Sequence, residues 1–156
     1  MIDINVPGYG QLLLEVLVLD YNGTLAIDGL LPIKVKEKIA VLADSLEIHI
    51  ITSDTFGSVT AECQGLPVQV KVLNTNNHTQ EKAAYLNQFG KRMVVAIGNG
   101  ANDELMLSKS DLGILVLGQE GCARRTLLAA QVIVKDIQDA LDLLLKPARL
   151  IATLRC

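Results

Sequence analysis

The chain has 156 residues, half of them apolar, and 14 basic against 17 acidic side chains give a formal net charge of −3. This length suits one domain over residues 1–156, and the absence of a basic run excludes nucleic-acid binding driven by charge alone. The longest apolar runs have the length of a strand and cannot span a membrane, and the N-terminus carries no secretory signal pattern. We therefore expect a cytoplasmic protein with no membrane partner.

The apolar residues are nearly all aliphatic, because the chain holds no Trp, three Tyr and two Phe. Aliphatic composition of this kind is typical of a parallel sheet covered by helices. The three cysteines, Cys63, Cys122 and Cys156, are widely spaced and match no metal-binding or redox motif, so we expect reduced thiols.

Segments with strand and helix patterns alternate along the chain. Strands are expected at 2–6, 12–19, 47–51, 68–73, 93–97, 112–117 and 132–134. Helices are expected at 32–45, 57–64, 79–89, 104–109, 123–129, 136–146 and 147–155. Alternation implies parallel strands joined by right-handed crossovers, so we expect a three-layer Rossmann-like α/β fold with a mostly parallel sheet and helices on both faces. The first two strands form an N-terminal hairpin whose first strand lies at a sheet edge.

Several local features follow from the same patterns. The segment 25–31 is expected to form a small flap with Asp28-Gly29 at its tip. Segment 68–73 is expected to be a core strand, and Asp54 and Thr55 are expected to cap the next helix. The helix at 32–45 should bury Ile33, Ile39 and Leu42, followed by Leu46.

Polar residues follow the predicted strands at their carboxyl ends. Asp20 ends the second strand and Thr52 ends the third, and the loop Asn99–Asp103 follows the fifth. Lys82 lies near the start of a helix. Because the carboxyl ends of parallel strands share one edge of a sheet, and ligands bind at that edge, we expect these side chains to converge.

These residue types suit phosphoryl transfer. Asp20 can attack phosphorus and carry it as an acyl phosphate. Thr52 and Lys82 can hold phosphoryl oxygens and offset their charge, and we place Ser53 and Gly23 at the phosphate with them. Asp20 and Asp103 together can hold Mg²⁺ through oxygen ligands.

The chain resembles the haloacid dehalogenase superfamily from about residue 12 to 146. The superfamily signature combines Asp-x-Asp-Gly-Thr, a strand-terminal Thr or Ser, a Lys, and Gly-Asp-Gly-x-Asn-Asp. Here it appears, in the same order, as Asp20-Tyr21-Asn22-Gly23-Thr24, Thr52, Lys82 and Gly98-Asn99-Gly100-Ala101-Asn102-Asp103. The resemblance is strongest to small soluble relatives of P-type ATPase phosphorylation domains. It implies a phosphorylated substrate and Mg²⁺ as the cofactor.

Two positions depart from the signature. Asn22 stands where superfamily phosphatases carry the Asp that protonates the leaving group and later activates water, and an amide cannot exchange protons in this way. The resemblance still implies that the Asn22 backbone carbonyl binds Mg²⁺. Asn99 replaces a second Asp, so its amide oxygen can bind Mg²⁺ with one negative charge fewer, and Asp103 becomes the main acidic partner of Asp20.

The chain leaves no room for a cap domain, either in the flap or between Thr52 and Lys82. In the superfamily this implies a large substrate or a site covered by neighbouring subunits. Uncapped relatives that hydrolyse a sugar-acid phosphate form tetramers through their flaps, so we expect a homo-oligomer, a tetramer or a dimer, joined through the apolar flap.

Three functions remain open. The first is a Mg²⁺-dependent, soluble P-type-ATPase-like phosphohydrolase that works through an aspartyl phosphate. The second is an oligomeric phosphomonoesterase for a small sugar or acid phosphate. The third is a regulatory module in which Asn22 and Asn99 have slowed or ended turnover.

Overall fold

The structure of the protein is a computed structural model, and it describes residues 1–53, 57–74 and 76–156. Six parallel strands form the sheet in the order β4-β3-β2-β5-β6-β7, and β1 adds to it by pairing antiparallel with the first part of β2. The strands are β1 (Ile2–Val6), β2 (Gly10–Asp20), β3 (Glu47–Thr52), β4 (Gln69–Val72), β5 (Met93–Gly98), β6 (Leu112–Val116) and β7 (Val132–Val134).

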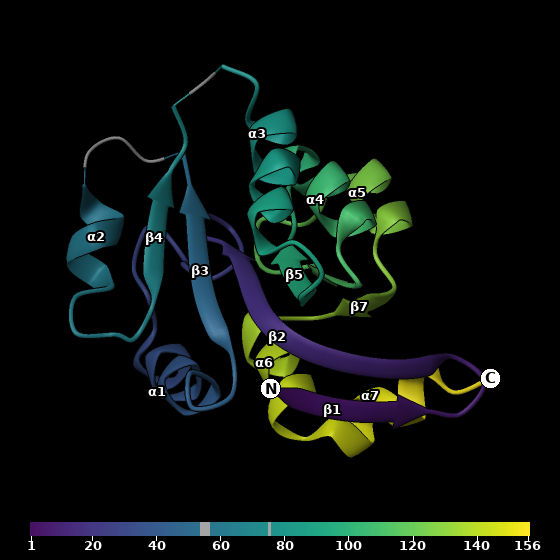
Figure 1. The fold of residues 1–156 in the computed structure, drawn as a ribbon. Coiled ribbons are helices and arrows are strands. Elements are labelled where there is room, and N and C mark those ends of the chain that lie inside the picture. The colour runs from purple at the N-terminus through teal and green to yellow at the C-terminus, as the bar shows by residue number, and fades with distance from the viewer. Residues whose placement is uncertain (54–56, 75) are drawn as a thin grey trace.

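Helices cover both faces of this sheet, which gives three layers (Figure 1). One face carries α1 (Ile33–Leu42), α2 (Ser58–Glu62), α6 (Ile137–Leu145) and α7 (Pro147–Leu154). The other face carries α3 (His78–Tyr85), α4 (Glu104–Lys109) and α5 (Arg124–Ala129), with 3₁₀ turns at Leu86–Phe89 and Ala101–Asp103. No helix in the described ranges is both long and apolar enough to cross a membrane.

The central strand β2 divides the core between the two faces. Val16 and Val18 pack toward α3 and α4, whereas Leu17 and Leu19 pack toward α1 and α6. Side chains of a strand alternate between faces, so Asp20 continues the Val16–Val18 row. The alternation therefore directs the last side chain of β2 to the face that carries α3.

The predicted α/β architecture, the N-terminal hairpin and the order of the elements are confirmed. Where a cap could be inserted, the described residues form only the segment 25–31, whose Ile27 and Leu30 make an antiparallel bridge, and, between Thr52 and Lys82, α2, β4 and the start of α3. The expected cap residues Asp54 and Thr55 lie outside the described ranges.

Two local predictions were wrong. Ile33 is 74% exposed, and the buried stripe of α1 is Val35, Ile39 and Leu42. Those three follow the four- and three-residue spacing of one helix face, and Ile33 falls on the opposite side. The segment 68–73 is also not a central core strand, because β4 ends the strand order and its residues are exposed or half-buried.

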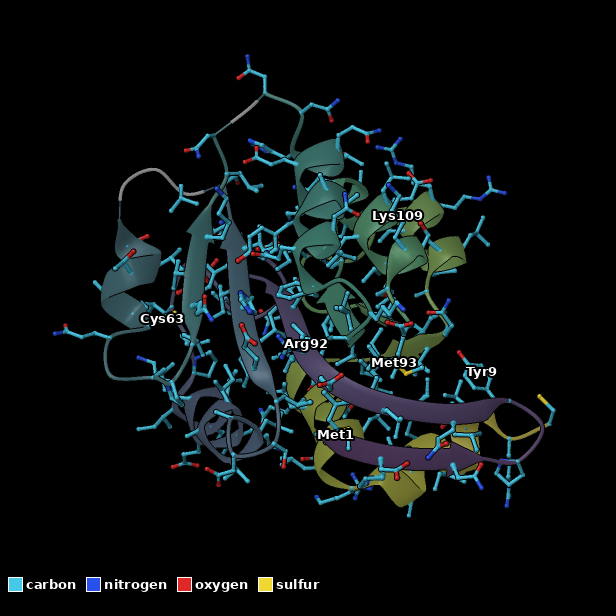
Figure 2. All side chains as sticks on the ribbon, in the orientation of Figure 1. Met1, Tyr9, Cys63, Arg92, Met93 and Lys109 are labelled. Carbon is cyan, nitrogen blue, oxygen red and sulfur yellow. The ribbon has the colours of Figure 1, made fainter. Side chains whose placement is uncertain are left out.

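Arg92 marks the amino-terminal edge of the sheet, opposite to the edge where β2 ends. Its guanidinium lies 2.6 Å from Glu47 and 3.8 Å from Glu15, and it stands beside β2 and β3 in Figure 2. All three side chains are more than a third exposed, so these ion pairs contribute little stability. The charged side chains at this edge of the sheet are therefore exposed to solvent.

Asp142 links three helices on the α1 face. Its carboxylate on α6 binds Lys38 of α1 and lies 2.9 Å from Lys146 and 3.3 Å from Arg149 of α7. The hydrogen bond from Lys38, followed by the one from Lys146, lowers the pKa of Asp142 to about 2.

We predict that Asp142→Asn lowers the free energy of unfolding by about 1 kcal/mol at pH 7, a value reduced for solvent screening. A carboxyl whose folded-state pKa lies below its unfolded value of 3.8 stabilises the fold above that value. The wild-type advantage should therefore disappear as the pH falls from about 4 toward 2, as measured by urea unfolding. Asp44→Asn, at an exposed site, is the control and should change the unfolding free energy by less than about 0.5 kcal/mol. A difference between Asp142→Asn and wild type that persists at pH 2 would contradict this assignment.

Candidate active site

The site begins where β2 ends and the chain turns sharply. The backbone amides of Thr24, Leu25 and Ala26 all donate to the carbonyl of Tyr21, so the chain coils directly after Asp20. Gly23 has φ +75°, a left-handed conformation that glycine adopts without strain. This tight turn, signalled by Asn22-Gly23 in the sequence, brings Thr24 back over the Asp20 carboxylate.

A buried lysine joins the two acidic residues that the sequence singled out. Lys82 Nζ lies 2.5 Å from Asp20 Oδ1 and 2.6 Å from Asp103 Oδ1. The Lys82 side chain is 1% exposed, that of Asp103 is completely buried, and that of Asp20 is 10% exposed. The chain therefore brings Asp20, Lys82 and Asp103 together, and Asp20 alone of the three reaches the surface.

The surroundings of Asp20 and Lys82 raise the pKa values of both groups. Burial, followed by repulsion from Asp103, raises the pKa of Asp20 to about 7, although Lys82 and Thr24 act in the opposite direction. Burial lowers the pKa of Lys82, but the attraction of Asp20 and Asp103 outweighs it, and the net pKa is raised. Lys82 is thus held as the ammonium ion between two carboxyl groups.

Asp103 is fixed by the backbone of its own loop. The amides of Asn99 and Gly100 donate to its Oδ2 at 3.0 and 2.9 Å. Its carboxylate packs so closely over Gly98 that a Cβ there would lie 2.5 Å from Asp103 Cγ, which explains the glycine. Lys82 donates to Oδ1, so the Asp103 carboxylate accepts hydrogen bonds from three donors. Both of its oxygens are therefore bonded within the protein.

Asp20 and Asn99 present the oxygens that could bind a metal ion. The Thr24 hydroxyl lies 3.1 Å from both Asp20 Oδ2 and Asn99 Oδ1, and its single proton serves only one of them at a time. Asn99 Nδ2 donates to the Gly121 carbonyl, which directs the amide oxygen toward Asp20. Hard oxygen donors of this kind, completed by water and substrate oxygens, suit Mg²⁺.

The described residues contain no group of three or more His, Cys, Asp or Glu side chains that could hold a metal ion. A cation at this site would therefore depend on amide, carbonyl, water or substrate oxygens in addition to carboxylate. Within these limits the donor set fits a weakly held divalent cation.

The remaining predicted residues lie around Asp20. Thr52 is buried at the end of β3, and its neighbour Ile51 pairs in register with Asp20. Ser53 and the Asn22 side chain are exposed, and Gly23 is half-buried. The structure therefore places all of the predicted site residues at the same edge of the sheet.

Two polar residues of this region were not predicted to be functional. Thr24 contacts both Asp20 and Asn99, and its place at the end of the run Asp20–Thr24 was the available signal. Glu120 follows β6, and its Oε2 lies 2.5 Å from the position that a Cβ on Gly23 would take. Nothing in the local sequence around Glu120 indicates this placement.

His49 is a buried residue whose ring contacts join two elements of the fold. It is 2% exposed, and its Nδ1 lies 2.9 Å from the Tyr85 hydroxyl while Nε2 lies 2.8 Å from Glu47. Its ring also meets Phe89 edge to face. It anchors α3 to β3 on the face that holds Lys82.

Comparison with known proteins agrees with this geometry, although no protein-family model matches the chain. An uncharacterized protein of Methanocaldococcus jannaschii is 56% identical over 64 residues, which are 41% of this chain and 69% of that protein. A soluble P-type ATPase-like phosphatase of the same organism is 26% identical over 140 residues, or 87% of this chain. The chain spans about half, 51%, of that phosphatase.

Among solved structures, the 3-deoxy-D-manno-octulosonate 8-phosphate phosphatase of Moraxella catarrhalis, in complex with magnesium, phosphate and 3-deoxy-D-manno-octulosonate, has the same fold. It superposes with a TM-score of 0.71 at 17% identity, and the match covers 91% of this chain and 94% of that one. The sequence match to the archaeal phosphatase and this shared fold confirm the resemblance of the chain to uncapped hydrolases of the haloacid dehalogenase superfamily.

Proposed function

We propose that the chain is a Mg²⁺-dependent phosphohydrolase that uses Asp20 as its nucleophile. The observation that carries the proposal is the contact of Asp20 with the buried Lys82 ammonium at the carboxyl end of the central strand. An isolated carboxylate that burial drives toward its neutral form is a poor nucleophile. The adjacent ammonium favours the anion that attack on phosphorus requires.

In the proposed reaction an Asp20 oxygen attacks phosphorus, the bond to the leaving oxygen breaks, and the phosphoryl group passes to the carboxylate. Water then hydrolyses the aspartyl phosphate and regenerates Asp20. Lys82 offsets the negative charge of the phosphoryl oxygens, and Thr52, Ser53 and the backbone at Gly23 are proposed to bind them. Positioning and charge compensation supply most of the catalysis in such reactions.

Asp20 Oδ2, the Asn99 amide oxygen and the Asn22 backbone carbonyl are the proposed Mg²⁺ ligands. We expected Asp103 to bind the metal as well, and its three hydrogen bonds now suggest a second task, the positioning of Lys82. Bound Mg²⁺ would offset phosphate charge and hold the substrate beside Asp20. Because Asn99 contributes no charge, we expect weaker Mg²⁺ binding than a second aspartate would give.

The two candidate functions differ in the phosphoryl donor that the protein would use. Similarity to a soluble P-type ATPase-like phosphatase favours an activated phosphate, such as a nucleoside triphosphate. A cavity of about 290 Å³ beside Thr24 favours a small phosphomonoester, whose leaving group it could receive. The structural match to the Moraxella catarrhalis sugar-acid phosphatase also supports the second candidate.

We predict that Asp20→Asn abolishes phosphate release, because an amide cannot form the acyl phosphate. Phosphate release and protein labelling would be measured with Mg²⁺ and with ATP, acetyl phosphate or p-nitrophenyl phosphate. Chelation of Mg²⁺ should suppress wild-type release, and the preferred donor chooses between the two candidates. A hydroxylamine-labile label without release would show that hydrolysis of the aspartyl phosphate is stalled. Neither label nor release from any donor would favour a regulatory module.

We predict opposite stability effects for two substitutions in the buried triad. In metal-free buffer Asp20→Asn should not lower the free energy of unfolding, because it removes a carboxyl that burial and Asp103 disfavour in its charged form. Lys82→Met should lower it by about 3–5 kcal/mol, because two buried carboxyl groups lose their partner. Urea unfolding measures both changes. A large loss for Asp20→Asn would mean that its inactivity reports misfolding rather than the missing nucleophile.

We also propose a homo-oligomer, a dimer or a tetramer, in which a second copy covers the flap. Three large apolar side chains are exposed at the flap and the start of α1: Ile27 at 43%, Leu30 at 66% and Ile33 at 74%. An exposed apolar patch beside a site without a cap is typical of an interface.

We predict that Leu30→Glu reduces the mass measured by light scattering to that of the monomer. The matched control is Leu128→Glu, at an exposed leucine of α5, which should leave the mass unchanged. A monomeric wild type would contradict the proposal.

A further inference from the structure

Glu120 lies against Gly23, the residue that follows Asn22 in the first motif. Its Oε2 is 2.5 Å from the position that a Cβ on Gly23 would occupy, and Gly23 directly follows Asn22. Asn99 Nδ2 lies 2.9 Å from the same position. A carboxylate from a distant loop therefore reaches the turn that carries Asn22 and sits next to the second departure, Asn99.

The Glu120 loop is held against the active site by hydrogen bonds at both ends. Asn99 Nδ2 donates to the Gly121 carbonyl at 3.1 Å, and the Ala123 amide donates to the Asn99 carbonyl at 3.0 Å. At its start, the Gly118 amide donates to the Lys135 carbonyl at 2.8 Å. These contacts fix the backbone on either side of Glu120 and hold the loop next to the Asn99 loop, with the Glu120 side chain exposed.

Glu120 shares a cavity with the residue that touches the nucleophile. The cavity of about 290 Å³ is lined by Gly23, Thr24, Glu120 and Asp136, among others, and the Thr24 hydroxyl bonds Asp20 Oδ2. Asp136 is occupied as the cap of α6, where it accepts from the Asp139 amide. Asp103 has three donors on its carboxylate. No described residue forms an ion pair with Glu120, so of these three carboxylates it is the one free to exchange a proton with a ligand.

We propose that Glu120 performs the proton transfers that Asn22 cannot, and that the adjoining cavity receives the leaving group of the substrate. The proposal rests on the proposed phosphohydrolase function. It identifies a small phosphomonoester, whose alkoxide leaving group needs a proton, as the class of substrate that the site is built to hydrolyse.

The proton balance of the two steps is complete with Glu120 alone. In the first step Asp20 bonds to phosphorus, the bond between phosphorus and the leaving oxygen breaks, and that oxygen takes the proton of the Glu120 carboxyl. In the second step water gives a proton to the Glu120 carboxylate and bonds to phosphorus while the bond to Asp20 breaks. Phosphate leaves, and Glu120 is again protonated for the next turnover. General acid–base assistance of this kind accelerates a step by about 10²–10⁴-fold.

The test is Glu120→Gln, assayed on two esters that differ in their need for a proton. For glycerol phosphate, whose alkoxide is a poor leaving group, kcat/KM should fall about 10²-fold or more. For p-nitrophenyl phosphate, whose phenolate leaves unprotonated, kcat/KM should change less than about threefold. Hydrolysis of the aspartyl phosphate should slow in both cases, so p-nitrophenol should appear in a burst followed by slow turnover.

Two further variants make the result specific. Glu37→Gln makes the same chemical change on the exposed surface of α1 and should leave both esters unaffected. Asn22→Asp in the Glu120→Gln background should restore glycerol phosphate hydrolysis, because it returns an acidic group to the first motif. A purely structural role of Glu120 would not produce this rescue.

Other outcomes overturn the proposal without touching the phosphohydrolase function. An equal loss of kcat/KM for both esters, or a loss that excess Mg²⁺ reverses, would assign Glu120 to positioning or to the cation. Full activity of Glu120→Gln on glycerol phosphate would remove it from the reaction. An inactive wild-type enzyme with every donor would instead reject the proposed function itself.

Discussion

The Lys82 ammonium between Asp20 and Asp103 is the interaction on which the rest of the site depends. Two carboxyl groups buried close together repel each other and each loses its hydration, so without a cation between them both would be driven toward the neutral form. Lys82 comes from α3, Asp20 from β2 and Asp103 from the loop after β5, so one side chain ties three elements together. Burial and repulsion from Asp103 raise the pKa of Asp20 to about 7, and the Lys82 ammonium acts against that rise because it favours the ionised carboxylate.

The strand periodicity of β2 makes this arrangement possible. Val16 and Val18 set the face on which Asp20 emerges, and the same face carries α3, so Lys82 reaches Asp20. A shift of one residue in the pairing of β2 would turn Asp20 toward α1 and α6 and leave Lys82 with Asp103 but without Asp20. The packing of the apolar core and the contacts of Lys82 therefore require the same register of β2. Such agreement between local packing and the overall fold favours a single folded structure.

Much of this structure could be predicted from the sequence, because the relevant signals are local. Runs of apolar residues predicted the strands, and the residues Asp20–Thr24 predicted the turn after β2. The predictions failed where the sequence pattern was ambiguous. Ile33 is as apolar as Val35 but lies on the solvent-exposed face of α1. Val70 resembles a core residue, although β4 lies at the edge of the sheet. Apolar character alone does not tell which face of an element is covered.

Local sequence patterns predict only part of the candidate site. Asp20, Thr52, Lys82 and Asp103 could be identified because each stands at a strand end or in a recognisable motif. Glu120 lies a hundred residues from Asp20 on an exposed loop, and its approach to Gly23 arises from hydrogen bonds that no local pattern encodes. The substitutions at Asn22 and Asn99 would, considered alone, suggest a weakened enzyme. The folded chain places the Glu120 carboxylate against Gly23, next in sequence to Asn22 and close to the Asn99 amide, so the loss of an acidic group from a motif does not establish its loss from the site.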